Sequence, residues 1–238
     1  MSQFNINNLC ARNVQINGKD VKVNGRDIVP EECRRVEERK TISAIDIESI
    51  SICTKRADIN IVEADLYVID IRLYGRTREQ NQISFLNVTA SKNKLEINLD
   101  EYEMSNLALE VKLPKKLFQK VEVTSRQGDI LICEGITTNK LNMQTMSGDI
   151  DAKCTFTHLL AIASSGDINI ATIAEKDIAN ACIQSKSGDI VVQFENVGNM
   201  ELTMQTMSGD AKNYRTAKGG KYSANVNLNT MSGDIVCK

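Results

Sequence analysis

Residues 141–150 read LNMQTMSGDI, and the end of this stretch recurs with small changes through the second half of the chain. A Gly-Asp pair, in most cases with Ser before it and Ile after it, occurs six times, with its glycines at Gly128, Gly148, Gly166, Gly188, Gly209 and Gly233. The intervals between these glycines are 20, 18, 22, 21 and 24 residues. A repeat with such a period indicates a fold built from stacked structural units.

When the six units are aligned on their glycine, apolar and polar residues alternate, as they do in strands with one buried face. The inward row is apolar seven and five residues before the glycine, as at Leu141 and Met143, and in most units small and polar three and one before it, as at Thr145 and Ser147. The apolar row resumes at Ile150 but slips by one residue across Gly-Asp, which indicates a bend between two short strands. Two-residue hairpin turns favour Asn-Gly or Asp-Gly over Gly-Asp. We therefore predict a parallel β-solenoid whose coils of about 20 residues stack about 4.8 Å apart.

The chain is predicted to be all-β throughout and to divide after residue 40. Residues 1–40 are expected to hold a small β-meander, with tight-turn signals at Asn17-Gly18 and Asn24-Gly25, and then a charged connector at residues 31–40 that is either a short helix or a solvated segment. Residues 41–238 are expected to form one solenoid domain, in which Ala57-Asp58 resembles a further corner and one upstream strand closes at Gly75.

The bulk properties exclude several classes of protein. A formal net charge of −2 provides no basic surface for nucleic acid. No apolar run approaches the length of a membrane span, and the first residues lack the pattern of a secretory signal. Seven cysteines, an odd number without a C-x-x-C pair, favour free thiols in a reducing compartment, so we expect a cytoplasmic protein. The single histidine, His158, has no partner pattern that would predict a metal site or a Ser-His-Asp triad.

The aspartates of the repeat would place one carboxylate on each coil, at Asp129, Asp149, Asp167, Asp189, Asp210 and Asp234. Unit charges about 5 Å apart repel each other, by about 1 kcal/mol in water. The favoured explanation is that each carboxylate accepts backbone amide hydrogen bonds at its corner. One alternative is a Ca²⁺ ion between adjacent carboxylates, for which Asp129, Asp149, Asp167 and Asp189 are the weak candidates. The other is acid–base chemistry on a glycan, which an aromatic content of 4% and the absence of Trp disfavour. We predict no cofactor.

The outward positions next to the corner suggest a binding surface. Methionines stand two residues before the glycine in three units, and glutamines stand four before it in three units: Met146, Met207, Met231, Gln144, Gln184 and Gln205. Methionine side chains repack readily, and exposed contiguous apolar area usually has a use. We predict that these residues form a face for a protein partner; the alternative is that another layer of the protein covers them.

The chain stops at Lys238, shortly after its last Gly-Asp corner, with no capping element between. An open coil exposes unpaired backbone groups. We therefore expect self-association through the C-terminal coil.

Residues 109–114 (LEVKLP), 121–130 (VEVTSRQGDI) and 141–150 resemble the bacterial "putative adhesin" family, also called toastrack-like, in which a strand ending in Leu-Pro precedes serial Ser-Gly-Asp corners. Gln127 in place of Ser, Ala211 in place of Ile and the first 30 residues depart from that pattern. The resemblance implies a β-solenoid used for binding or as a scaffold, often associated with envelope-stress systems, and it provides no known catalytic residues to carry over to this chain. We predict a non-enzymatic interaction module that presents a flat face to a protein partner. The alternatives are a self-polymerising scaffold and, less favoured, a carbohydrate-active enzyme.

Overall fold

The structure is a computed structural model that describes residues 14–17, 20–23, 26–28, 33–79, 84–215 and 219–238. The chain divides into two units, Met1–Arg34 and Arg35–Lys238. The first unit holds an antiparallel meander of β1 (Val14–Asn17), β2 (Asp20–Val23) and β3 (Arg26–Ile28), as the sequence predicts. The glycines of its two expected turns, Gly18 and Gly25, lie outside the described residues.

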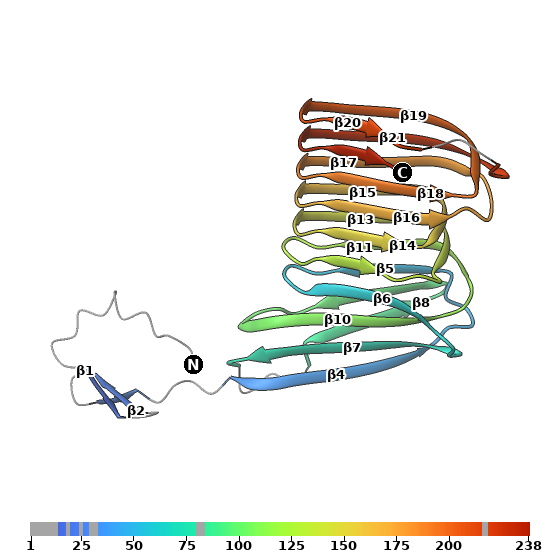
Figure 1. The fold of residues 1–238 in the computed structure, drawn as a ribbon. Coiled ribbons are helices and arrows are strands. Elements are labelled where there is room, and N and C mark those ends of the chain that lie inside the picture. The colour runs from blue at the N-terminus through green and yellow to red at the C-terminus, as the bar shows by residue number, and fades with distance from the viewer. Residues whose placement is uncertain (1–13, 18–19, 24–25, 29–32, 80–83, 216–218) are drawn as a thin grey trace. The chain divides into compact units, whose positions relative to one another are not determined.

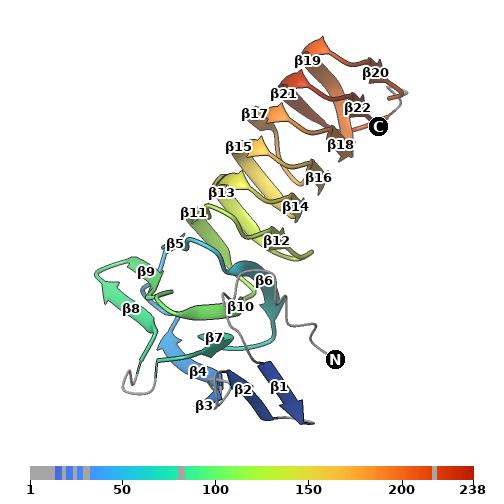
Figure 2. The ribbon, with the colours of Figure 1, turned by 90° about the vertical axis from the view of Figure 1, so that its left-hand side faces the viewer.

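The second unit consists of two large sheets on either side of a common core (Figures 1 and 2). The ten-stranded sheet contains β4 (Arg34–Ser43), β6 (Asp58–Ala64), β7 (Val68–Thr77), β10 (Met104–Pro114), β12 (Ile130–Ile132), β14 (Ile150–Lys153), β16 (Ile168–Ile173), β18 (Ile190–Glu195), β20 (Ala211–Asn213) and β22 (Ile235–Cys237). The nine-stranded sheet contains β5 (Ser49–Cys53), β8 (Leu86–Ser91), β9 (Lys94–Leu99), β11 (Leu117–Thr124), β13 (Thr137–Ser147), β15 (Thr155–Ser165), β17 (Ile178–Ser187), β19 (Val197–Ser208) and β21 (Tyr222–Ser232).

Each repeat unit forms one winding, which we define as a strand of the nine-stranded sheet, a corner and a strand of the ten-stranded sheet. Neighbouring windings pair in parallel with like residues in register, so that Leu141 lies beside Leu159 and Ile150 beside Ile168. All four of these side chains are buried. The prediction of a parallel β-solenoid with an apolar inward row is therefore confirmed.

The glycine of each corner is required by close backbone packing between windings. At Gly166 φ is 144°, and a Cβ atom would lie 2.1 Å from the carbonyl oxygen of Gly148 on the adjacent winding. Only a residue without a side chain fits this position. The hydroxyl three residues earlier bonds to a neighbouring corner, as when Thr145 Oγ1 donates to the Gly128 carbonyl oxygen at 3.4 Å.

One predicted part of the inward row is wrong. The serines directly before the glycines, including Ser147, Ser165 and Ser187, are exposed rather than turned inward. The chain has already begun to bend at this position, so the alternation of the strand ends two residues earlier, at the buried Thr145 and Ser185.

The windings do not stack in the order of the sequence at the C-terminal end. The sheet orders run β17-β21-β19 and β18-β22-β20, so the winding made last, β21–β22, lies between the two windings that precede it in the chain. The outermost winding is β19–β20 (Figure 2). The expectation that the C-terminal coil is the open one is therefore wrong, because that coil has a neighbour on each side.

The first windings also depart from simple serial stacking. The corner at Ala57-Asp58 is confirmed, since β5 and β6 pair in parallel with β11 and β12. Upstream of this corner not all neighbouring strands are parallel, because β7 is antiparallel to β10 and β8 is antiparallel to β9. β7 also continues through Gly75 to Thr77 instead of ending at the glycine.

The charged segment expected to be a helix or a connector is a strand over its described part. β4 begins at Arg34 and forms the edge of the ten-stranded sheet beside β7. Val36 is buried, while Arg39 Nε donates to Asp70 Oδ1 at 2.6 Å. The charges led to the wrong prediction because an edge strand with one solvated face tolerates them as well as a connector does.

Candidate interaction face and corner edge

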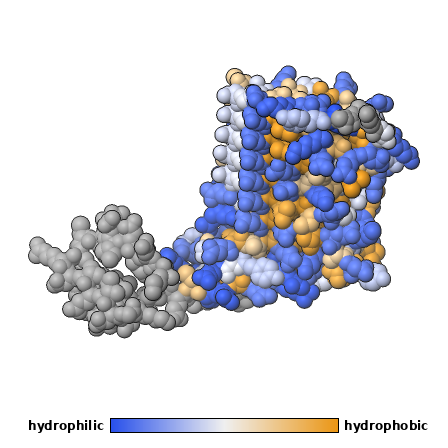
Figure 3. Space-filling model, in the orientation of Figure 1, coloured by the Kyte–Doolittle hydropathy of each residue, from blue (hydrophilic) through white to orange (hydrophobic). Residues whose placement is uncertain are grey.

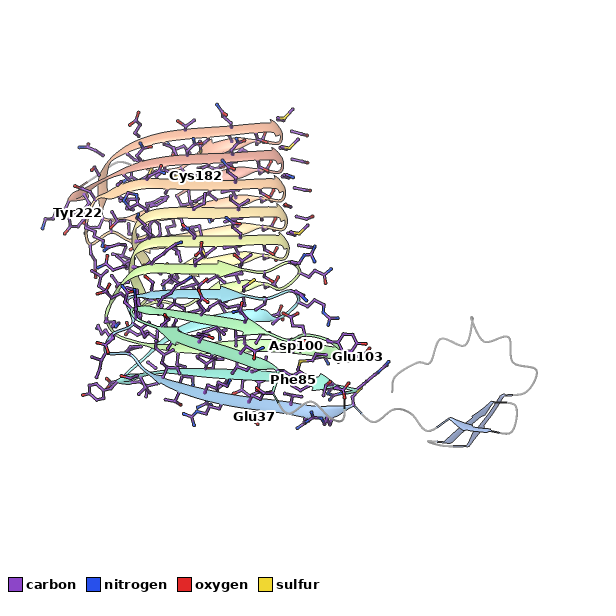
Figure 4. All side chains as sticks on the ribbon, turned by 180° about the vertical axis from the view of Figure 1, so that it is seen from behind. Glu37, Phe85, Asp100, Glu103, Cys182 and Tyr222 are labelled. Carbon is purple, nitrogen blue, oxygen red and sulfur yellow. The ribbon has the colours of Figure 1, made fainter. Side chains whose placement is uncertain are left out.

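The predicted binding residues lie on the outer face, which we define as the outward side chains of β11, β13, β15, β17, β21 and β19. Met146, Met207 and Met231 are 56%, 81% and 52% exposed. Cys182, labelled in Figure 4, belongs to the same face on β17. No part of the chain that the structure describes buries these methionines.

The order of the windings decides which methionines meet. Because β19 pairs directly with β21, Met207 and Met231 lie side by side. Met146 stands on β13, and the register places Ser164 of β15 and Lys186 of β17 between it and Met231. The structure thus brings two of the three predicted methionines together and leaves the third apart.

The outward residues two positions before the methionines, which we call the amide row, likewise form an unbroken row of amide side chains only at one end of the solenoid. Gln184, Asn229 and Gln205 are paired in register across β17, β21 and β19. Gln144 is separated from Gln184 by the apolar Ile162. Two of the three predicted glutamines are therefore joined through an asparagine that the prediction did not include.

The aspartates form a hydrogen-bonded ladder along the corner edge. The backbone amide of each corner aspartate donates to Oδ1 of the aspartate on the adjacent winding: Asp129 to Asp58 at 3.1 Å, Asp149 to Asp129 at 2.8 Å, Asp167 to Asp149 at 2.8 Å, Asp189 to Asp167 at 2.8 Å, Asp234 to Asp189 at 2.7 Å and Asp210 to Asp234 at 2.8 Å. The column of carboxylates is thus explained by backbone hydrogen bonds, although the donor belongs to the next winding and not to the same corner. The edge appears as a pale stripe beside a hydrophilic stripe in Figure 3.

The two ends of the aspartate ladder have different polar partners. At the N-terminal end the buried carboxylate of Glu101 accepts the amides of Lys55 at 2.5 Å and Arg56 at 2.6 Å. At the other end Asp210 lies on the outermost winding, and Lys212 Nζ is 2.9 Å from its Oδ2. The hydrogen bond from Lys212, together with its charge, lowers the pKa of Asp210.

The candidate cation ligands Asp129, Asp149, Asp167 and Asp189 each already use Oδ1 in this ladder. Within the described residues there is no group of three or more His, Cys, Asp or Glu side chains suited to hold a metal ion. His158 is exposed on β15, beside Lys140 and Asn180.

The sequence reasoning expected an open end but assigned it to the C-terminal winding and not to β19–β20, where the structure has it. A hollow of about 680 Å³ lies there, with Met200, Leu202, Asn213 and Arg215 in its lining. The guanidinium of Arg215 donates to the carbonyl oxygen of Val197. A signal was present, because the unit that ends the stack has Ala211 and Asn213 where the next unit has Ile235 and Cys237.

The described cysteines are all free. Burial raises the pKa of Cys154 to about 12, and burial also raises the pKa of Cys237 despite the nearby charge of Arg215. The described part of the chain contains no helix with the length and hydrophobicity that crossing a bilayer requires.

Comparison with known proteins identifies the family. A family model described as Toastrack DUF4097 matches residues 47–155 and 118–238. The search of curated proteins gave no match. A solved structure described as a putative cell adhesion protein from Clostridium sporogenes is similar with a TM-score of 0.55 and 12% identity, over 86% of this chain and 99% of that chain.

Two further solved structures are described as putative adhesins. The one from Bacteroides fragilis has a TM-score of 0.38 and 12% identity over 85% of this chain and 97% of that chain, and the one from Parabacteroides distasonis has a TM-score of 0.39 and 11% identity over 84% and 97%. With the family model covering almost all of the solenoid, the chain belongs to the Toastrack DUF4097 family.

Proposed function

We propose that this protein is a non-enzymatic binding module that presents its outer face to a protein partner. The observation that carries the proposal is the exposed pair Met207 and Met231 on adjacent strands, next to the continuous amide row of Gln184, Asn229 and Gln205. The proposed site therefore lies over β17, β21 and β19, towards one end of the solenoid.

The chemistry of this region suits protein binding. Among the outward side chains of β17, β21 and β19, only Lys186 and Glu201 carry a charge. Docking a partner there removes few charges from water, which keeps the desolvation cost low. The backbone is already fixed by parallel pairing, so binding orders few groups beyond the flexible methionines.

The test is affinity capture with three forms of the whole chain. The double variant Met207→Asp with Met231→Asp places two charges in the centre of the proposed site. The matched control is Leu131→Asp, which makes the same kind of change at a 40% exposed residue of β12 in the other sheet. A separate Met146→Asp variant asks whether the site extends to β13.

The proposal expects one protein to be retained by the unaltered chain and by the Leu131 variant but lost with the double variant. That protein, once purified, should bind with an affinity at least about tenfold weaker to the double variant, since a charge buried in an apolar contact costs more than 1.4 kcal/mol. Equal binding by all forms would exclude the outer face as the site.

We further propose that the module works in a reducing bacterial compartment and that its partner belongs to an envelope-stress or signalling system. The free state of the described cysteines supports the first point, and the family resemblance supports the second. Cell fractionation of the untagged protein tests the location: recovery in the cytoplasmic fraction agrees with the proposal, and recovery at the cell surface contradicts it.

A further inference from the structure

The end of the solenoid at β19–β20 leaves a row of core side chains partly uncovered. Both strands lie at the edge of their sheets. On the winding beneath, Val226 and Leu228 are 1% and 0% exposed, whereas their neighbours on the outermost winding, Leu202 and Met204, are only partly buried. The inward row of β19 therefore has the composition of a core layer without a layer above it in the described chain.

The two ends of the solenoid differ in how their edge strands are protected. β4, the edge strand at the N-terminal end of the ten-stranded sheet, has six charged residues among ten, Arg34, Arg35, Glu37, Glu38, Arg39 and Lys40, and Figure 4 labels Glu37 on it. β19 has one charged residue, Glu201, among twelve, and it contains no proline. Charges and prolines are what normally keep an edge strand from pairing with another chain. At the other edge of the nine-stranded sheet, β8 also lacks charges and proline but has only six residues, so among the described edge strands β19 is the longest without such protection.

We propose that two copies of this chain pair through β19, antiparallel, about a two-fold axis at Thr203. This geometry joins the nine-stranded sheets of both copies into one sheet and keeps inward residues on the inward side. It rests mainly on the backbone edge of β19 and on the inward row, although Gln205 of the proposed partner site also lies along this edge.

The sequence of β19 is self-complementary in this register. On the inward side Leu202 lies opposite the partner's Met204, so the partly exposed core residues cover each other. On the outward side Glu201 lies opposite the partner's Gln205, so its charge meets an amide instead of another carboxylate. Like charges directly opposite each other destabilise a strand pair, and apolar pairs stabilise it. About ten new backbone hydrogen bonds accompany the contact, since an antiparallel ladder forms roughly one per residue.

The same observations specify a closed dimer and not a filament. A contact between identical β19 edges uses the open end of both copies at once, so the pair closes on itself and neither copy has a second β19 edge to offer. Head-to-tail growth would instead place β19 against the short edge strand β8 and β20 against β4, whose six charges oppose apolar pairing.

The test uses the residue on the axis, because that residue meets its own copy. Thr203 is exposed, so Thr203→Lys and Thr203→Glu change the charge of the edge without disturbing the core. The matched control is Asn227→Lys, at the residue paired with Thr203 on β21, which is exposed on the same face but is not at the edge. Circular dichroism checks that each variant is folded, and sedimentation velocity over a range of concentrations gives the association constant.

The unaltered chain and the Asn227 variant are expected to form dimers, and each Thr203 variant alone should associate at least about tenfold more weakly, because like charges meet at the axis. An equimolar mixture of the Lys and Glu variants should recover the dimer, since opposite charges then face each other. Hydrogen exchange should show β19 amides protected more strongly at high protein concentration. A monomer at all concentrations, assemblies larger than a dimer, or a mixture no better than its components would overturn the proposal.

Discussion

The amide of Asp234 donates to Oδ1 of Asp189 at 2.7 Å, although 45 positions separate the two residues in the chain. The corresponding bonds donated by the amides of Asp149, Asp167, Asp189 and Asp210 join aspartates only 18 to 24 positions apart. The long step exists because β21–β22 is placed between β17–β18 and β19–β20. The hydrogen bonds of the corner ladder therefore join windings that are neighbours in space, and this order differs from the order of the windings in the sequence.

The inner position of β21 gives a prediction about stability. Leu228 is fully buried on β21, while Leu202 is only partly buried on the outermost β19. Leu228→Ala is expected to lower the free energy of unfolding by about 2–5 kcal/mol, as for other core leucines. Leu202→Ala, measured by chemical denaturation at low protein concentration, should cost less than half as much. The reverse ranking would mean that the C-terminal winding is the exposed one.

The ladder itself can be tested at Asp167, whose Oδ1 accepts the amide of Asp189 at 2.8 Å. Asp167→Ala removes the acceptor and is expected to lower the free energy of unfolding by about 1–3 kcal/mol, the cost of leaving a hydrogen-bonding group unpaired. Asp167→Asn keeps an acceptor oxygen and relieves repulsion along the column, so its effect should stay within about 1 kcal/mol. Equal losses for the two variants would show that charge, and not the hydrogen bond, is what matters at this position.

Close packing at the corners predicts a strong effect of a single methyl group. In Gly166→Ala the new Cβ would lie 2.1 Å from the Gly148 carbonyl oxygen, at a φ of 144°. We expect a loss of at least about 3 kcal/mol of unfolding free energy, because two windings would have to separate locally. The matched control is Gly219→Ala, where φ is 82° and no atom lies within 4 Å; this variant should lose only about 1–2 kcal/mol from backbone strain.

The thiols should differ sharply in reactivity. Cys154 and Cys237 are buried with raised pKa values, so a thiol reagent at pH 8 should not modify them in the native protein. The exposed Cys53 should react at once. All seven cysteines should react after unfolding. Cys53→Ser should remove one fast-reacting thiol, whereas Cys154→Ser should change only the count obtained in denaturant; rapid native labelling of Cys154 would contradict its placement in the core.

Much of the solenoid could be predicted because its rules are local. The alternation of apolar residues, as at Leu141, Met143 and Ile150, is enough to predict the inward row. The Gly-Asp pair is enough to predict the bend. The order of the windings could not be obtained in this way. Residues 143–149 and 204–210 both read MQTMSGD, so the corner pattern does not specify which unit lies next to which.

Two weaker signals would have improved the prediction. Ala211 and Asn213 mark a winding with little to bury on one side, and the alternation of Val36 with charged residues marks an edge strand. The placement of Met207 beside Met231 could not be predicted from the sequence, because it depends on the inserted winding. The separation of Met146 from the other two methionines has the same cause.

The inserted winding also bears on how the protein is made. Residues Val197–Asn213 are synthesised before Tyr222–Cys237, yet the later segment lies between the earlier one and β17–β18. The windings at this end therefore cannot be added to the stack one after another in the order in which they are synthesised. Before β21 and β22 are synthesised, β19 and β20 either stay unpaired or pair with β17 and β18. In the second case those pairs must break before β21 and β22 can insert, so this end of the solenoid reaches its final order only after β22 has been synthesised.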